Sequence, residues 1–287
     1  MAICNINGNA RPVAYDFRGT ITDSVYDCHG NIIPSVPGKL IFEDDFNGTV
    51  LDETVWNYET GYIRNNEQQA YSDSVNNVYL ENGNLVIRAI REPAQAYKNG
   101  VLTNFDWTSG SIQTNNKVEL MYGRWEARIK FPGITGSFPA FWTLGAGYEY
   151  SYNNANQGNK GTKWPYCGEI DIAEHYPGGG ATTTHGAIYN TSPTANNGID
   201  LGRNRSKSID VTEYHVYALE WSETKMSFYV DDDLVSTSTI TDAMTMFRQP
   251  HYIILNLAIG ASGGTPPSDV DEMKMYVDWV RVYAPLE

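Results

Sequence analysis

Three carboxylates occupy one short stretch of the chain, Gly168-Glu-Ile-Asp-Ile-Ala-Glu174. On a regular β-strand Glu169 and Asp171 share one face, and Glu174 would point the other way. A β-bulge near Ile172-Ala173 would return Glu174 to the acidic face, since bulges insert one extra residue and are enriched beside active sites. The outer Cα atoms would then lie roughly 13 Å apart. Carboxyl groups leaning toward each other would come to about 5–6 Å, the separation a retaining glycosidase uses for its nucleophile and its acid/base.

An edge strand with one wet face is the structural alternative to a catalytic strand. Three like charges on one face destabilise a strand, which favours a functional reason for keeping them. Trp125, Trp142 and Trp164 lie on neighbouring predicted strands or loops and could stack on sugar rings. We expect Trp221 and Trp279, which lie within apolar strands, to be core residues.

Period-two alternation dominates the rest of the chain and predicts short strands. Asn82-Gly83 closes the clearest hairpin, within residues 77–90. The only helical candidate is short, at residues 242–248. Further strands are expected at 40–46, 117–131, 138–144, 169–175, 185–189, 215–221, 225–230, 251–259 and 273–283. This pattern predicts an all-β fold, an antiparallel sandwich of two sheets.

Two domains are expected. Residues 1–37 lack strong alternation and are interpreted as an N-terminal extension or the remnant of another module, and residues 38–287 as the sandwich. Residues 145–161 form a long polar loop before the carboxylate strand, and loops of that length are usually functional or disordered. Cys4 and Cys28 could pair in an exported protein, or be unrelated thiols.

The charge balance narrows the range of partners. The chain has 34 acidic and 20 basic residues in 287, a formal net charge of −14. It has no basic cluster, so nucleic acid, anionic membrane surfaces and polyanionic substrates are all disfavoured. No apolar run approaches the length of a membrane span. Neutral, hydroxyl-rich partners remain.

The sequence resembles glycoside hydrolase family 16, the laminarinase-like β-glucanases, over residues 38–285. The resemblance rests on several motifs: Phe42-Glu-Asp-Asp-Phe-Asn-Gly48, Asn65-Asn-Glu-Gln-Gln-Ala-Tyr71, Gly123-Arg-Trp-Glu-Ala-Arg-Ile-Lys130, Phe138-Pro-Ala-Phe-Trp142, Gly168-Glu-Ile-Asp-Ile-Ala-Glu174 and Val277-Asp-Trp-Val-Arg-Val-Tyr283. It implies a β-jelly roll of two curved antiparallel sheets with a concave substrate cleft. The segment Ala261-Ser-Gly-Gly-Thr-Pro-Pro267 departs from the family, which commonly has a tryptophan there.

The resemblance implies roles for the carboxylates. Glu169 would be the nucleophile, Glu174 the general acid/base, and Asp171 a helper that shares a proton with Glu169. Glu174 must be protonated to donate to the leaving oxygen, and burial with nearby negative charge would raise its pKa. No cofactor is expected for catalysis.

The resemblance also suggests ligand contacts. The candidates for sugar binding are Asn65, Glu67, Arg88, Trp142, Trp164, His185 and Asn256, although Asn65 and Glu67 could only cap a loop, Arg88 could pair within the hairpin, and His185 could be a hydrogen-bonded strand residue. A structural calcium ion is expected near Glu43, Gly83 and Asp278, bound by hard oxygen donors. Asp278 could instead only hydrogen-bond a neighbouring strand.

The six-residue form with Ala173 resembles laminarinases, which implies endo-hydrolysis of neutral β-1,3-glucan. Mixed-linkage β-1,3-1,4-glucan, or another polysaccharide such as a red-algal galactan, is the alternative within the family. A non-catalytic β-glucan recognition protein is the alternative of another class, and the presence of both glutamates argues against it. We expect a secreted monomer, although no signal peptide is visible in this sequence.

Overall fold

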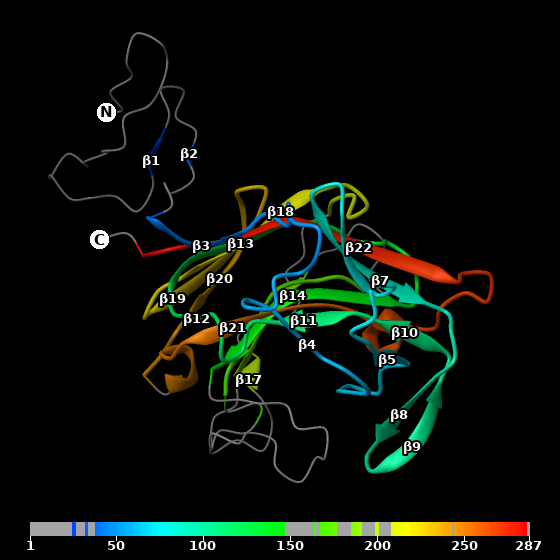
Figure 1. Ribbon diagram of the computed structural model, residues 1–287. Helices are drawn as coiled ribbons and strands as arrows, with labels where there is room; N and C mark the ends of the chain where they lie inside the picture. Colours follow the sequence, from blue (N-terminus) through cyan, green and yellow to red (C-terminus); the bar gives the residue numbers. More distant parts are fainter. Residues whose placement is uncertain are drawn as a thin grey trace, which may run out of the picture.

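The computed structural model describes residues 38–146, 164, 167–176, 208–242 and 244–285, together with the backbone of four short strands at 25–26, 32–33, 185–190 and 199–200. Two large sheets stack as layers (Figure 1). None of the helices in this described part is long and apolar enough to cross a membrane. The expected all-β jelly-roll sandwich is confirmed. The expected helix at 242–248 is reduced to one 3₁₀ turn, η2 (Thr245–Phe247).

The larger sheet has ten strands. In order across the sheet they are β20 (Asp233–Thr239), β19 (Lys225–Val230), β18 (His215–Trp221), β13 (Gly123–Lys130), β22 (Glu272–Tyr283), β7 (Asn84–Ile90), β10 (Trp107–Ser109) and β5 (Gln69–Tyr71), with β3 (Leu40–Asp44) paired to β22 and β6 (Val78–Glu81) paired to β7. All these pairs are antiparallel except β10 with β5, which is parallel.

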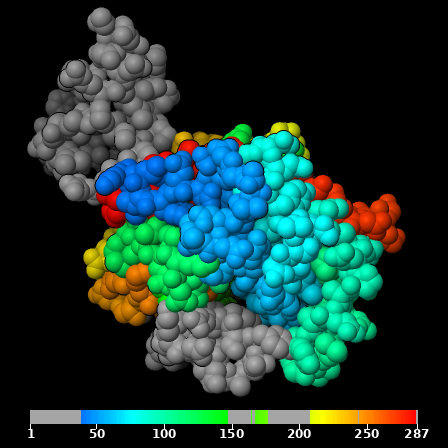
Figure 2. Space-filling model, in the orientation of Figure 1, coloured from blue at the N-terminus to red at the C-terminus, as the bar shows by residue number. Residues whose placement is uncertain are grey.

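The smaller sheet has eight strands and is antiparallel throughout. Its order is β17 (Ile199–Asp200), β16 (His185–Asn190), β15 (Glu169–Glu174), β14 (Ser137–Gly145), β21 (His251–Ile259), β11 (Ser111–Gln113) and β4 (Asn57–Tyr58), with β12 (Glu119–Leu120) paired to β21. Two separate hairpins complete the fold. They are β1 (Val25–Tyr26) with β2 (Ile32–Ile33), and β8 (Ala94–Lys98) with β9 (Val101–Phe105). The β8–β9 hairpin projects beside the sheets, at the lower right of Figures 1 and 2.

The core lies between the sheets and is rich in aromatic residues. Trp56, Trp125, Phe131, Phe141 and Tyr217 are almost fully buried in it. Burying side chains of this size contributes about 1.5–3 kcal/mol each relative to exposure. The β6–β7 hairpin closes as its sequence predicts, because Asn82 and Gly83 both adopt positive φ angles (53° and 73°), as a type I′ turn requires.

The expectation that Trp279 is a core residue is wrong. The pairing of β22 with β13 shifts between Arg128 and Ile129, so that Trp279 opposes Arg128 while Val277 opposes Ile129. Asp278 is therefore an extra residue, and the alternation inverts there. Trp279 turns to the outer face, where the Arg281 guanidinium lies 4.2 Å from the centre of its ring. Trp221, by contrast, is a core residue as expected.

A second bulge lies in β15, and it confirms the one predicted at Ile172-Ala173. Trp142 of β14 opposes Asp171, and Phe141 opposes Ala173, so Ile172 is passed over. On the other side, Asp171 opposes Ala187 and Glu174 opposes His185, so β15 has two residues between these pairs where β16 has one. Ile170, Ile172 and Ala173 all join the main core. The bulge thus turns two successive side chains inward and returns Glu174 to the face of Glu169 and Asp171.

Shortening and lengthening the bulge by one residue should both destabilise the protein, but to different extents. Deletion of Ala173 leaves Glu-Ile-Asp-Ile-Glu, a regular strand in which Ile172 opposes Phe141 and the final glutamate still opposes Ala140. We expect this variant to fold with a loss of about 1–2 kcal/mol, the cost of a buried methyl and local repacking. A second alanine inserted after Ala173 would turn the Glu174 carboxylate toward the core, at a cost of several kcal/mol. Urea unfolding of both variants compares them, and an insertion as stable as the deletion would contradict this account of the register.

Candidate functional site

The three carboxylates of β15 project from the face of the eight-stranded sheet that is turned away from the core. Glu174, Asp171 and Glu169 oppose Ala140, Trp142 and Leu144 on β14. Opposed residues of an antiparallel pair lie on the same face. The three β14 residues pack in a separate cluster with Cys167, Tyr252 and Ile254. The three carboxylates therefore lie beside this second apolar cluster, on the outer face of the sheet.

Asp171 is the most deeply placed of the three. Its side chain is 2% exposed, and its Oδ2 atom is buried without a hydrogen-bond partner among the described residues. Burial raises the pKa of Asp171 well above its usual value, and the negative charges of Glu174 and Glu169 raise it further. Both effects favour the protonated form of Asp171.

Glu169 interacts electrostatically with Asp171, but unlike Asp171 Oδ2 it has a hydrogen-bond donor beside it. The Trp164 indole donates a hydrogen bond from Nε1 to Glu169 Oε2 at 2.8 Å. Burial raises the pKa of Glu169 to about 7, while this hydrogen bond and the positive charge of Arg64 act in the opposite direction. The two carboxyl groups titrate together. Because Asp171 lacks such partners, we assign the shared proton to Asp171 and the negative charge to Glu169.

A buried polar chain continues from the carboxylates across the same face. Trp142 donates from Nε1 to Asn256 Oδ1 at 2.7 Å, and Asn256 donates from Nδ2 to the Tyr71 hydroxyl at 3.0 Å. The Arg64 guanidinium lies 4.9 Å from the centre of the Trp142 ring and 5.9 Å from that of Tyr71. Trp142 and Asn256, both candidates from the sequence, are thus brought together here.

Arg64 is anchored by the Glu59 carboxylate and is also influenced by the charge of Glu67. It binds Glu59 through both terminal nitrogens, one of them at 3.1 Å, and Ser111 Oγ donates to the same Glu59 carboxylate at 2.6 Å. Glu67 is 3% exposed and accepts a hydrogen bond from Gln69 at 2.7 Å. Burial raises the pKa of Glu67 to about 7, opposed by the charge of Arg64. Glu67 therefore belongs to the same buried network.

Sequence reasoning did not name Arg64, Glu59 or Tyr71 as site residues. The spacing of Arg64 and Glu59 does not distinguish them from exposed loop residues. The available signal was their sequence neighbourhood, since Arg64 immediately precedes the motif that begins at Asn65 and Tyr71 ends that motif. Asn65 itself is exposed, with a positive φ of 56°, and no described contact joins it to the network.

Two other expected contacts lie elsewhere in the described structure. Arg88 projects from the outer face of the ten-stranded sheet, on the far side of the core from the carboxylates, and forms an ion pair with Glu272 of β22. It is therefore not brought to the site, and it pairs outside its own hairpin. Trp125 is fully buried in the core and is not a sugar platform. The register places His185 opposite Glu174, but its side chain lies outside the described residues.

The expected calcium residues each have other partners. Glu43 accepts a hydrogen bond from Arg281 at 2.8 Å, and Asp278 accepts one from Arg128 at 2.5 Å. Gly83 occupies the positive-φ turn of its hairpin. Among the described residues, no group of three His, Cys, Asp or Glu side chains could hold a metal ion.

Cys4, Cys28 and most of the polar loop lie outside the described residues, whereas Cys167 is a buried thiol.

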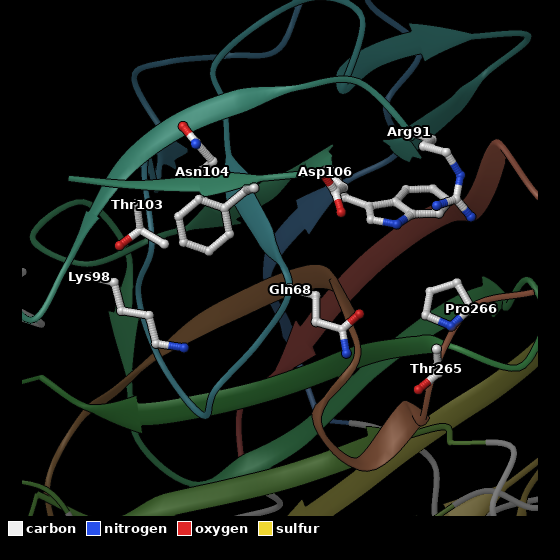
Figure 3. A pocket seen from close by; sticks show the side chains of 10 residues that line it. Gln68, Arg91, Lys98, Thr103, Asn104, Asp106, Thr265 and Pro266 are labelled. Carbon is white, nitrogen blue, oxygen red and sulfur yellow. The ribbon is translucent and has the colours of Figure 1, made fainter. Parts of the chain in front are cut away.

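A cavity of about 410 Å³ opens between the β8–β9 hairpin and the segment after β21 (Figure 3). Lys98, Thr103 and Asn104 border it on the hairpin side, and Gln68, Thr265 and Pro266 on the other side. None of the three carboxylates lines it. Gln68 adjoins Glu67 in sequence, and its backbone N–H donates a hydrogen bond to the Ile259 carbonyl at 2.8 Å. The cavity therefore lies next to the buried network rather than over the acidic strand.

This arrangement can perform acid/base and nucleophilic chemistry on a neutral ligand. It offers an ionised carboxylate, a neighbouring protonated one and a third carboxylate on one face, beside an indole that is 44% exposed. Two carboxylates flanking a sugar–oxygen bond are the minimal machinery of glycoside hydrolysis.

Comparison with known proteins agrees with that chemistry. The family model described as "Beta-porphyranase A-D, GH16 domain" matches residues 41–285. Glucan endo-1,3-beta-glucosidase A1 of Niallia circulans is 34% identical over 277 residues, covering 87% of this chain but only 38% of that protein. The beta-glucanase of Rhodothermus marinus is 32% identical, covering 85% of each chain.

A solved structure is also similar. LamA of Z. galactanivorans, in complex with laminaritriose and laminaritetraose, superposes with a TM-score of 0.75 at 31% identity, covering 86% of this chain and all of that one. With its fold, its acidic strand and its relatives in agreement, the chain belongs to glycoside hydrolase family 16.

Proposed function

We propose that the protein is a retaining endo-glycosidase that hydrolyses β-1,3-glucan of the laminarin type. The observation that carries this proposal is the bulged strand, which holds Glu169 and Glu174 on one face with Asp171 between them. Relatives named as glucan endo-1,3-beta-glucosidase and beta-glucanase, and a solved relative holding laminari-oligosaccharides, support the choice of substrate.

The charge distribution supports different roles for the carboxylates. Glu169, stabilised as an anion by Trp164 and Arg64, attacks the anomeric carbon and forms a covalent glycosyl-enzyme. Glu174 first protonates the leaving oxygen and then deprotonates the incoming water. Asp171 holds a proton beside Glu169, which keeps two adjacent negative charges from forming in a buried site. No cofactor is needed for these steps.

Sugar contacts are divided between the two tryptophans. Trp164 is the more exposed, and its indole N–H already reaches the nucleophile, so we assign it the stacking face nearest the reacting sugar. Trp142 is 6% exposed and has Arg64 over its ring. It supports the floor of the site, together with Asn256, more than it offers an open platform.

A second candidate substrate is favoured by one observation. The matching family model carries a porphyranase description, which points to a galactan of the porphyran type. The net charge of −14 argues against a sulfated polymer. Arg64, the cation among the described residues whose charge acts on Glu169, is buried and already bound to Glu59. We therefore place neutral β-1,3-glucan first and the galactan second.

The proposal extends to the domain arrangement, the location and the partners of the protein. We propose that residues 38–287 form the catalytic domain, and that residues 1–37 are an extension or module remnant. We propose a secreted monomer that binds neither nucleic acid nor membranes, in keeping with its strongly acidic charge.

Replacing Glu169 with serine should abolish hydrolysis while leaving oligosaccharide binding intact. The serine hydroxyl cannot act as the carboxylate nucleophile, so we expect a loss of kcat of at least about 10⁴-fold. Activity is measured in parallel on laminarin, lichenan and porphyran, with laminarihexaose binding measured by calorimetry. The control is Glu213→Ser, at an exposed glutamate just before β18 that lies outside the carboxylate face. Residual laminarin hydrolysis near wild type in the serine variant would refute the assignment, and activity on porphyran alone would select the second substrate.

Asp171→Asn should stabilise the protein increasingly as the pH rises. In the unfolded chain this carboxyl group ionises above about pH 4. In the folded chain its pKa is raised, so the folded state loses stability from pH 4 up to that higher pKa. The variant removes this loss and should gain at least about 1 kcal/mol at pH 7 and nothing near pH 3.

Thermal unfolding at pH 3, 5 and 7 checks this expectation. Asp210→Asn is the control, because hydrogen bonds from Thr212 lower the pKa of the exposed Asp210. That substitution should give no gain at any pH. A gain for Asp171→Asn that does not change with pH would contradict a buried proton.

We also propose the structural calcium ion, bound by backbone oxygens near Glu43 and Gly83 and by the Asp278 carboxylate. The carboxylates of Glu43 and Asp278 each bind an arginine, so they fit an ion only through their remaining oxygens. Millimolar calcium should raise the melting temperature above its value in a chelator by a few degrees. Asp278→Asn should remove most of that difference, and equal melting temperatures with and without calcium in the wild type would exclude the ion.

A further inference from the structure

Arg64 is an unusual residue for the place it occupies. It is 7% exposed, forms an ion pair with Glu59 and is also stabilised by the charge of Glu67. Arginine is almost never buried this deeply unless it is paired. Removing one partner of a buried ion pair strongly lowers the stability of the fold, because the other charge is left unpaired. The Glu59–Arg64 pair therefore holds the guanidinium in one place, and the residues around it are positioned by it.

The contacts of Arg64 are directional. Its planar guanidinium binds Glu59 through two nitrogens, which fixes its plane. In that plane it lies over Trp142 and also near Tyr71. Trp142 is in turn fixed by its hydrogen bond to Asn256 and directly opposes Asp171 on the neighbouring strand. Arg64 thus holds the ring that forms the floor beside the carboxylates.

The charge of Arg64 also reaches the carboxylates. Besides burial, two groups act on Glu169, namely Trp164 from the preceding segment and Arg64 from across the face. Glu169 in turn raises the pKa of Asp171, on its own strand, and of Cys167 beside it, and Glu174 also raises the pKa of Asp171. Among the described residues, Arg64 is the only cation whose charge lowers the pKa of Glu169. It opposes the burial that favours protonation of Glu169.

Arg64 does not serve as a ligand for an anionic sugar. Glu59 engages both of its terminal nitrogens, and Ser111 holds that carboxylate from the other side. A sulfate or uronate would have to displace a buried ion pair to reach the guanidinium. The pair is therefore part of the scaffold of the site, even though no sequence motif marks it.

We propose that Arg64, anchored by Glu59, is a positioning residue that fixes Trp142 under the substrate and keeps Glu169 ionised for attack. This inference rests on the proposed hydrolysis of β-glucan by Glu169 and Glu174. It assigns two separable effects to one side chain. Its planar stacking acts on substrate binding, and its charge acts on the pH dependence of the chemical step.

Two substitutions separate these effects. Arg64→Lys keeps the charge but loses the planar, bidentate geometry, so KM should rise several-fold while the acid limb of kcat/KM stays in place. Arg64→Met removes the charge as well. Loss of a neighbouring cation raises the pKa of Glu169, so the acid limb of kcat/KM should move up by about one pH unit, with the same rise in KM.

Glu59→Gln/Arg64→Met guards against misfolding, because it removes both members of the buried Glu59–Arg64 ion pair while Gln69 still donates a hydrogen bond to Glu67. It should fold at least as well as Arg64→Met and show the same upward shift of the acid limb. Arg124→Met is the matched control. Arg124 is equally buried in the ten-stranded sheet, with Glu126, Glu220 and Asp232 as partners. It should lower stability and leave the pH profile unchanged.

The measurement is kcat/KM for laminarin from pH 4 to 9, with thermal unfolding of every variant. An acid limb that does not move in Arg64→Met or in the double variant would overturn the proposal, as would an equal shift in Arg124→Met. Absence of laminarin hydrolysis by the wild type would instead overturn the proposed function. The two failures are therefore distinguishable.

Discussion

The structure depends on one electrostatic constraint, which is that three carboxylates must share one largely buried face of a strand. Two adjacent negative charges are tolerated poorly there, and three more poorly still. The described neighbours relieve the constraint in three ways. Asp171 keeps a proton, Trp164 donates a hydrogen bond to Glu169, and the cationic Arg64 lies across the face.

The β-bulge is the geometric counterpart of that constraint. A strand with strict alternation would bury Glu174 in the aromatic core, where its charge would cost several kcal/mol. The extra residue turns both Ile172 and Ala173 inward, so the core gains apolar contacts at the point where the outer face gains its third carboxylate. Stability and chemistry are served by the same irregularity. A comparable bulge at Asp278 shows that the fold uses such irregularities elsewhere to invert the side that a strand presents.

The second half of the site is a scaffold rather than a set of ligands. Glu59, Arg64, Tyr71, Asn256 and Trp142 are connected by hydrogen bonds, an ion pair and ring contacts, and all are largely withdrawn from solvent. Networks of this kind fix side-chain geometry because every member would lose a partner if one moved. We assign substrate contact instead to more exposed groups of this face, such as Trp164.

The sequence by itself determined the all-β class, the acidic strand and its bulge. Alternation has a period of two, and the count of residues between charged positions reveals where that period is broken. It also placed Glu67, Trp142 and Asn256 among the candidates through a family resemblance. It misplaced Arg88, a candidate taken from the family resemblance, which lies on the other sheet. It also misplaced Trp279, because the bulge at Asp278 inverts the alternation of β22.

Only the tertiary structure decided which residues support the carboxylates. Arg64 and Glu59 lie about a hundred residues before β15 in the chain, and no local pattern connects them to it. They meet the carboxylate face because β4, β11, β21 and β14 stand side by side in one sheet, an order fixed by long-range pairing. The energies that matter there, burial of a charge and the presence of its partner, depend on distances through space, and spacing along the chain does not encode them.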